Sequence, residues 1–113
     1  MNYSDSPLIS VIVPCFNSGR TIKRTIFSIK KQTWEKKEII LVNDGSTDQL
    51  TKDILREIGD EKIVKLINQK NNGLASARNK GVKKSSGSFM FFLDADDWIE
   101  PEALEKMYFY LIR

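Results

Sequence analysis

Residues 88–97 read Ser-Phe-Met-Phe-Phe-Leu-Asp-Ala-Asp-Asp, an apolar run that leads directly into three aspartates. The apolar part, Ser88–Leu93, is short and nearly continuous, which is typical of a strand covered on both faces of its sheet. The acidic part follows where that strand must end. This stretch therefore predicts a buried strand whose carboxyl end carries charged side chains.

Three earlier runs have the same character, being short, rich in branched apolar residues and bounded by polar turn residues. With the first run, they give predicted strands at residues 8–13, 38–42, 63–67 and 88–93. Between and after them, apolar residues recur at helical spacing in residues 22–29, 50–58, 73–84 and 104–111. The expected helix starts are a cap at Asn17 or Ser18, a cap at Ser46, and Pro101 as a first helical residue.

This strict alternation predicts an α/β fold, a Rossmann-like parallel sheet of about four strands with helices on both faces. Gly81 lies inside a helical pattern at a cost of ~1 kcal/mol relative to alanine. We expect a close approach to the sheet to offset that cost. In such a sheet, sites open at the carboxyl ends of the strands, near the point where the strand order reverses.

The composition fits one domain and excludes several kinds of chemistry. The chain has 113 residues, one cysteine and no histidine, so an internal disulfide and a Ser-His-Asp triad are excluded. No apolar run approaches the ~20 residues of a membrane-spanning helix. Residues 1–7 are polar and expected to be extended or disordered, and no domain boundary is predicted within residues 8–113.

The charges are segregated along the chain, although the net charge is only +3. Residues 62–84 carry seven basic and no acidic side chains, and residues 94–105 carry six acidic and no basic ones. The basic stretch is read either as a solvated helix face or as a site for a small polyanion. Nucleic-acid binding is not expected, because no interleaved aromatics and no known motif accompany the lysines.

Two predicted segments carry polar residues whose role the local sequence leaves open. Asp44 follows the second strand and is either a turn aspartate or an acceptor for a uracil N–H or a ribose hydroxyl. Arg78 follows a run of small residues and either lies exposed on a basic helix or pairs with a phosphate or carboxylate.

The fourth strand end gives the clearest chemical prediction. If extended geometry persists, Asp94 and Asp96 point to the same side and repel each other unless a cation or donors compensate. Mg²⁺ and Mn²⁺ take one or two carboxylates together with substrate phosphate oxygens. We therefore expect a divalent cation at Asp94 and Asp96.

Four segments together resemble the nucleotide-binding half of family 2 glycosyltransferases, which have the GT-A fold. The resemblance covers the chain from about Leu8 to its end. The segments are Val11-Ile-Val-Pro-Cys-Phe-Asn17, Leu41-Val-Asn-Asp-Gly-Ser-Thr-Asp48, Asn72-Gly-Leu-Ala-Ser-Ala-Arg-Asn-Lys-Gly81 and Phe92-Leu-Asp-Ala-Asp-Asp97.

The resemblance implies an activity: transfer of a sugar from a nucleotide diphospho-sugar, usually UDP-linked, to an acceptor hydroxyl with inversion. It implies that Asp96, with Asp94, holds the metal that bridges the two phosphates in a DxD motif. The remaining implied nucleotide-sugar contacts are Pro14, Phe16 and Asn17 around base and ribose, Asp44 on uracil, Arg78 near base or diphosphate, and Asp94 and Ala95 near the ribose.

One departure from the family pattern limits the expected activity. Family members carry an acidic general base in a second half, and this sequence ends at Arg113, one helix after the DxD motif. We therefore expect a truncated chain that is inactive alone and associates with itself through surface exposed by truncation. The expected location is the cytoplasm, at the inner face of a membrane through parts outside this chain.

Two other classes remain open at this stage. One is a non-catalytic nucleotide-sugar binding or interaction module. The other is a different doubly wound protein, of which a dinucleotide-binding domain is disfavoured because no G-x-G-x-x-G follows the first strand. A phospho-receiver domain is disfavoured because its acids would follow the first and third strands.

Overall fold

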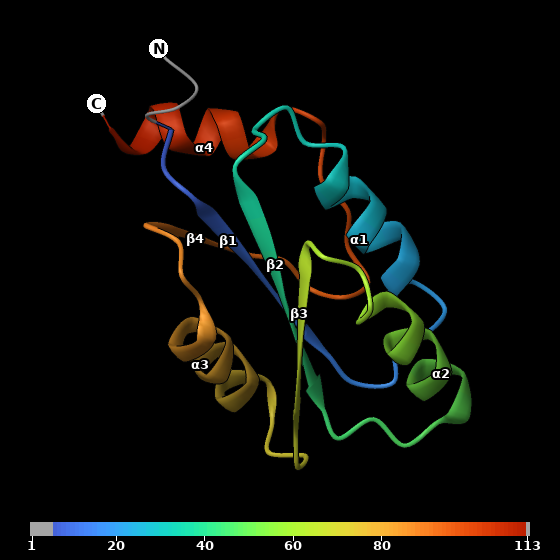
Figure 1. Ribbon diagram of the computed structural model, residues 1–113. Coiled ribbons are helices and arrows are strands. Elements are labelled where there is room, and N and C mark those ends of the chain that lie inside the picture. The colour runs from blue at the N-terminus through green and yellow to red at the C-terminus, as the bar shows by residue number, and fades with distance from the viewer. Residues whose placement is uncertain (1–5, 113) are drawn as a thin grey trace.

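The computed structural model describes residues 6–112 as eight alternating strands and helices (Figure 1). The expectation for residues 1–7 lies mostly outside the described residues. Of these seven residues, the structure describes Ser6 and Pro7, and the Pro7 carbonyl accepts a hydrogen bond from the Trp34 indole at 3.1 Å. The elements are β1 (Ile9–Cys15), α1 (Ile22–Lys30), β2 (Lys37–Asp44), α2 (Gln49–Ile58), β3 (Val64–Gln69), α3 (Leu74–Lys84), β4 (Phe89–Phe92) and α4 (Ala103–Leu111).

The four strands form one parallel sheet in the order β3-β2-β1-β4, which confirms the predicted α/β class. β1 is central and pairs with β2 from Ile9↔Lys37 to Cys15↔Asn43. Its other neighbour, β4, pairs only over residues 89–92. The chain thus steps outward from β1 to β3 and then returns to the other side of β1, so the strand order reverses between β1 and β4.

Helices cover both faces, as predicted, but unequally. Three helices, α1, α2 and α4, share the larger apolar cluster with the odd-numbered residues of β1, among them Val11 and Val13 (Figure 1). The opposite face is covered by α3, where Ala77 packs with Ile12, Ile40 and Val42. A Cβ at Gly81 would lie 2.5 Å from the Ile12 Cγ2, so the expected close approach of this glycine to the sheet is confirmed.

β1 runs two residues further than predicted, through Pro14 to Cys15. The predicted strand end at residue 13, just before Pro14, is wrong, and the sheet geometry explains why. The Ile12 carbonyl accepts from the Leu93 N–H, so even-numbered residues of β1 face β4. Pairing with β4 ends at Ile12, so the missing N–H of Pro14 faces a side where no ladder bond is required.

The predicted helix starts are also wrong in detail. The side chain of Asp48, not Ser46, caps α2 by accepting from the Thr51 N–H at 2.7 Å. The cap residue of α1 is Thr21, which makes no side-chain capping bond. Pro101 lies in a turn before α4, where its carbonyl accepts from the Thr33 N–H at 2.8 Å. None of the helices within residues 6–112 has the length and apolarity needed to cross a membrane.

Candidate functional site

The carboxyl ends of all four strands lie at one edge of the sheet, because the strands are parallel. At this edge β1 and β4 are the neighbours between which the strand order reverses. Ligands of open α/β sheets bind in the crevice formed at such a point. The sequence-predicted aspartates follow the strands at this edge.

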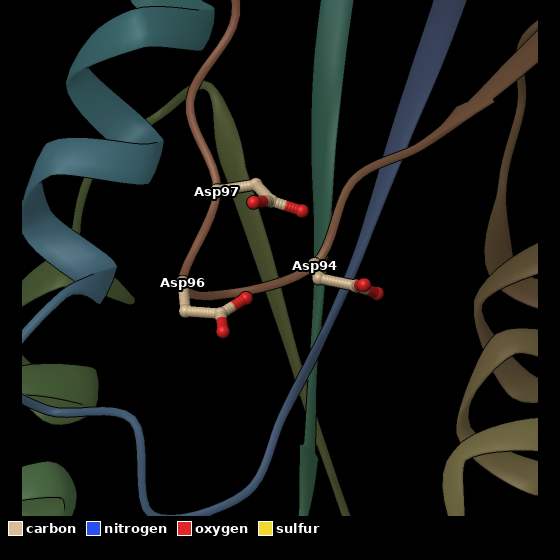
Figure 2. A group of neighbouring side chains, drawn as sticks. All are labelled: Asp94, Asp96 and Asp97. Carbon is tan, nitrogen blue, oxygen red and sulfur yellow. The ribbon is translucent and has the colours of Figure 1, made fainter.

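The turn after β4 gathers three carboxylates. The Asp97 N–H donates to the Asp94 carbonyl at 3.0 Å, which closes a tight turn over residues 94–97, hereafter the acidic turn. Carboxylate oxygens of Asp94, Asp96 and Asp97 all lie within 4.8 Å of one another. Figure 2 shows the three side chains on this turn, with Asp94 directed toward α3.

The acidic turn suits a hard divalent cation. Three carboxylates this close repel one another, and a cation with several oxygen ligands relieves that repulsion. Within residues 6–112, no other group of three or more Asp, Glu, Cys or His residues has this convergence. Sequence reasoning named Asp94 and Asp96 but missed Asp97, because it assumed that the chain stays extended beyond β4. The adjacent pair Asp96-Asp97 was the available signal.

Arg78 reaches the acidic turn from α3. Its Nη2 lies 3.3 Å from the Asp94 Oδ1, and both side chains are about half exposed. The Arg78 Nε is buried and has no hydrogen-bond partner among the described residues. The guanidinium therefore has donor capacity beyond this ion pair, and it brings positive charge to one side of the acidic turn.

Asp44 is buried, with 5% of its surface exposed, and its carboxylate is already bonded to the protein. Four groups of residues 69–73 donate to it, so this aspartate has a structural role, which is to hold the end of β3 and the connection to α3. A carboxylate has about four acceptor positions, and a uracil N–H would have to displace one of these donors. The donors are Gln69 Nε2 (2.8 Å), Asn72 N (2.8 Å), Gly73 N (3.0 Å) and Asn71 Nδ2 (3.4 Å).

A pocket of about 280 Å³ lies between the end of β1 and the start of α3, hereafter the β1–α3 pocket. It brings together three of the predicted site residues, Pro14, Phe16 and Asp44. It adds Cys15 and four residues that follow β3, none of which the sequence analysis named as site residues. Burial raises the pKa of the Cys15 thiol, so this side chain lines the pocket as a neutral group. The lining residues are Pro14, Cys15, Phe16, Asp44, Asn71, Gly73, Leu74 and Ala77.

Asn17 is not part of the β1–α3 pocket. It lines a neighbouring hollow of about 500 Å³ together with Asp96. Its φ is +53°, a conformation that asparagine tolerates better than most residues, and its Oδ1 accepts from Thr47 N at 2.8 Å and Asp48 N at 3.1 Å. Asn17 therefore ties the β1–α1 loop to the β2–α2 loop.

Ala95, the remaining predicted residue, is buried between the two aspartates of the motif. Its carbonyl is turned toward α1 and accepts from the hydroxyls of Thr21 at 2.8 Å and Thr25 at 2.9 Å. The backbone of the acidic turn is thus anchored on one side, while its carboxylates remain exposed on the other.

Comparison with known proteins gives consistent matches over this region. The chain is 40% identical over 104 residues to the putative glycosyltransferase EpsH of Bacillus subtilis (strain 168), a match that covers 91% of this chain and 30% of the relative. A crystal structure of S. aureus TarS 1–349 in complex with UDP-GlcNAc aligns with a TM-score of 0.80 at 32% identity, covering 92% of this chain and 31% of that one.

A mannosyltransferase, PcManGT from Pyrobaculum calidifontis, solved in complex with GDP-Man and Mn²⁺, aligns with a TM-score of 0.72 at 25% identity, over 86% of this chain and 30% of that one. The matches cover about a third of EpsH, of the TarS 1–349 chain and of the PcManGT chain. The family model described as Glycosyl transferase family 2 matches residues 10–113. This chain therefore belongs to glycosyl transferase family 2.

Proposed function

We propose that this chain is the donor-binding part of an inverting glycosyltransferase that moves a sugar from a UDP-linked nucleotide sugar to an acceptor hydroxyl. The observation that carries the proposal is the acidic turn, three convergent carboxylates where the strand order reverses. Support comes from TarS, solved with UDP-GlcNAc, and from PcManGT, solved with GDP-Man and Mn²⁺.

In this proposal the β1–α3 pocket receives the nucleobase. Pro14 and Phe16 offer apolar surface at the end of β1, and Phe16 is 48% exposed and free to cover a base. Asp44 contributes mainly by holding the β3–α3 connection, since its four donors occupy the carboxylate. Asn17 lines the neighbouring hollow with Asp96 and ties the β1–α1 loop to the β2–α2 loop beside the acidic turn.

Asp94, Asp96 and Asp97 would hold Mn²⁺ or Mg²⁺, both of which prefer carboxylate oxygens. A bound cation supplies positive charge that stabilises a diphosphate leaving group as the glycosidic bond breaks. Arg78 lies beside Asp94 with an unused donor and would bind a diphosphate oxygen on that side.

The proposal assigns donor binding, and not turnover, to these residues. No described side chain is assigned as the general base. Glu105 accepts a hydrogen bond from the Thr33 hydroxyl at 3.1 Å and lies in the first turn of α4, where an acidic residue stabilises the helix. We expect no sugar transfer by this chain alone, and detectable transfer would refute that part of the proposal.

Self-association is the second part of the proposal that this chain can test. The end of α4 exposes Phe109, Tyr110 and Leu111, of which Tyr110 is 74% exposed. Contiguous apolar surface of this kind favours association. Sedimentation velocity should show a concentration-dependent dimer or larger species, and a monomer at all concentrations would contradict this part.

Calorimetric titration of UDP tests donor binding. Wild type should bind UDP with Mn²⁺ and bind it at least about tenfold more weakly in EDTA, and Asp96→Asn should remove most of the metal dependence. Asp60→Asn is the matched control, an exposed aspartate with the same charge change in the turn after α2. Binding that ignores both the metal and Asp96→Asn would refute the metal assignment, and no binding at all would refute the proposed function.

A further inference from the structure

One side of α1 and of the residues that flank it carries polar residues at helical spacing, which the sequence analysis did not detect. They are Thr21, Thr25, Ser28 and Gln32, hereafter the α1 polar stripe. Residues at spacings of three and four lie on the same helix face. Thr25 is fully buried and Gln32 is 5% exposed, so their polar atoms need partners inside the protein.

Apart from Ser18, whose carbonyl accepts from Thr21 Oγ1 at 3.3 Å, the side-chain partners of the stripe outside α1 all belong to residues 95–104. These residues run from the acidic turn into the start of α4. The four side chains therefore act on a single segment. The contacts are Thr21 Oγ1 to Ala95 O (2.8 Å), Thr25 Oγ1 to Ala95 O (2.9 Å) and Asp97 O (2.5 Å), Ile99 N to Ser28 Oγ (3.3 Å), Gln32 Nε2 to Glu100 O (2.6 Å) and Leu104 N to Gln32 Oε1 (3.0 Å).

The acidic turn needs such support because the sheet does not provide it. Pairing between β1 and β4 ends at Phe92, and the Leu93 N–H makes the last bond to β1. Beyond it, the turn has its own bond from Asp97 N to Asp94 O. Repulsion among the three carboxylates acts against that bond and tends to open the turn.

Thr25 is the central member of the stripe. Its hydroxyl lies within hydrogen-bond distance of the carbonyls of Ala95 and Asp97, the residues on either side of Asp96. The alternative acceptor inside the helix, the Thr21 carbonyl, is farther away at 3.4 Å. The single hydroxyl proton of Thr25 therefore serves the turn, where the carbonyls of Ala95 and Asp97 share it. The Ala95 carbonyl, which precedes Asp96, also accepts from Thr21.

We propose that Thr25, assisted by Thr21, is a positioning residue that holds the acidic turn closed so that its carboxylates converge before a cation binds. The cation part of this proposal rests on the proposed function. Preorganised ligands bind more tightly because less ordering remains for the binding step. Thr25 acts through the backbone of the turn and contacts neither the cation nor the donor.

The test compares Thr25→Val, which removes the hydroxyl at nearly constant shape, with Thr25→Ser, which keeps it. Hydrogen exchange of the Asp97 amide is measured by NMR on the metal-free chain, relative to the core amide of Ile40. Mn²⁺ binding in the presence of UDP is measured by electron paramagnetic resonance. Ser10→Ala is the matched control, a fully buried hydroxyl in β1 that bonds Glu38 and Gly87 away from the site.

Thr25→Val should speed exchange at Asp97 relative to Ile40 by about tenfold and weaken Mn²⁺ binding by a similar factor, the size expected for one lost buried hydrogen bond. Thr25→Ser should restore both values. Ser10→Ala should change the exchange rates of the Asp97 and Ile40 amides by a common factor and leave the Mn²⁺ affinity unchanged. If Thr25→Val does not fold, Thr21→Val removes the 2.8 Å bond to the same Ala95 carbonyl and should act in the same direction.

Unchanged relative exchange at Asp97 in Thr25→Val would overturn the proposal, as would equal effects of Thr25→Val and Ser10→Ala. Failure of wild type to bind Mn²⁺ with UDP would overturn the proposed function and the cation part of this inference. The exchange measurement on the metal-free chain decides separately whether α1 holds the turn.

Discussion

Asp44 at the end of β2 and the acidic turn after β4 place the same residue type at the same edge of one sheet, with opposite results. The Asp44 carboxylate is buried and accepts from four donors of the β3–α3 connection. The acidic turn has three carboxylates, of which Asp94 is paired with Arg78. One aspartate is part of the scaffold, and the others leave most of their acceptor capacity available.

This contrast shows that the donors around a strand end, rather than the strand end itself, decide whether the protein occupies a carboxylate there or leaves it available. The loop opposite Asp44 supplies two backbone N–H groups and two side-chain amides. The segment opposite the acidic turn, the α1 polar stripe, bonds the backbone and leaves the carboxylates free. The two positions should therefore respond differently to substitution.

The largest expected effect is on stability, from Asp44→Ala. Removing the carboxylate leaves several donors around a buried position without an acceptor, at about 1–3 kcal/mol for each buried one, so the free energy of unfolding should fall by about 3 kcal/mol or more. Urea denaturation followed by circular dichroism measures the change. Asp44→Asn keeps one acceptor oxygen, so its free energy of unfolding should lie between those of wild type and Asp44→Ala. A loss below about 1 kcal/mol for Asp44→Ala would contradict the structural role of Asp44.

The second effect is on metal binding, from Asp97→Asn. This exposed side chain should leave the free energy of unfolding within about 0.5 kcal/mol of wild type, since surface changes of this kind cost little. Mn²⁺ affinity should fall by about tenfold because one charged ligand is lost. Equal affinity of wild type and Asp97→Asn in a Mn²⁺ titration would limit the site to Asp94 and Asp96.

Arg78→Gln should produce a smaller change. The Arg78–Asp94 pair is half exposed, so its loss should cost less than about 1 kcal/mol of stability. Binding of Mn²⁺ alone should tighten by about threefold, because Arg78 no longer competes for Asp94. Lys80→Gln on the same helix is the control for charge. Weaker Mn²⁺ binding in Arg78→Gln would instead mean that the arginine orients Asp94 as a ligand.

The smallest effect concerns Asp48, a carboxylate whose donors belong to a helix start. Bonding to Thr51 lowers the pKa of Asp48 in the folded chain. Because the pKa is lower in the folded chain than in the unfolded chain, the ionised Asp48 stabilises the fold at pH values above its unfolded pKa, near 4. This stabilisation is lost as the pH falls through the pKa of the folded chain. Asp48→Asn keeps a good cap without titrating, so its thermal midpoint should depend less on pH below about pH 4. If the thermal midpoints of wild type and Asp48→Asn depend on pH in the same way, the stabilising role of the Asp48 carboxylate is contradicted.

The order and type of all elements could be predicted from the sequence, because near-continuous apolar runs and helical repeats are local signals. Element ends were less accurate. The extension of β1 through Pro14 depends on β4 ending at Phe92, which is a fact about a strand far along the chain. Asp48 caps α2 in place of the predicted Ser46, because the Ser46 hydroxyl instead accepts from the Asn17 N–H at 3.0 Å.

The candidate site was predictable where the spacing within one motif carries it, and not where the folded chain brings groups together. Asp94 and Asp96 stand in one motif, whereas the convergence of the neighbouring Asp97 depends on the turn. The donors to Asp44 come from residues 69–73, and no local sequence pattern there predicts that they bond a carboxylate far away in the chain. The α1 polar stripe was missed because apolar periodicity was followed along that helix and polar periodicity was not.

The strand order has a consequence for how the chain folds. β1 pairs with β2, its next strand in the chain, over seven residue pairs, but it pairs with β4 over only four, across most of the sequence. Closing so long a loop costs more chain entropy, and fewer ladder bonds compensate for it. The β4 segment should therefore join the native structure late and detach first in partial unfolding. The edge that carries the acidic turn would then be the last part of the described chain to form.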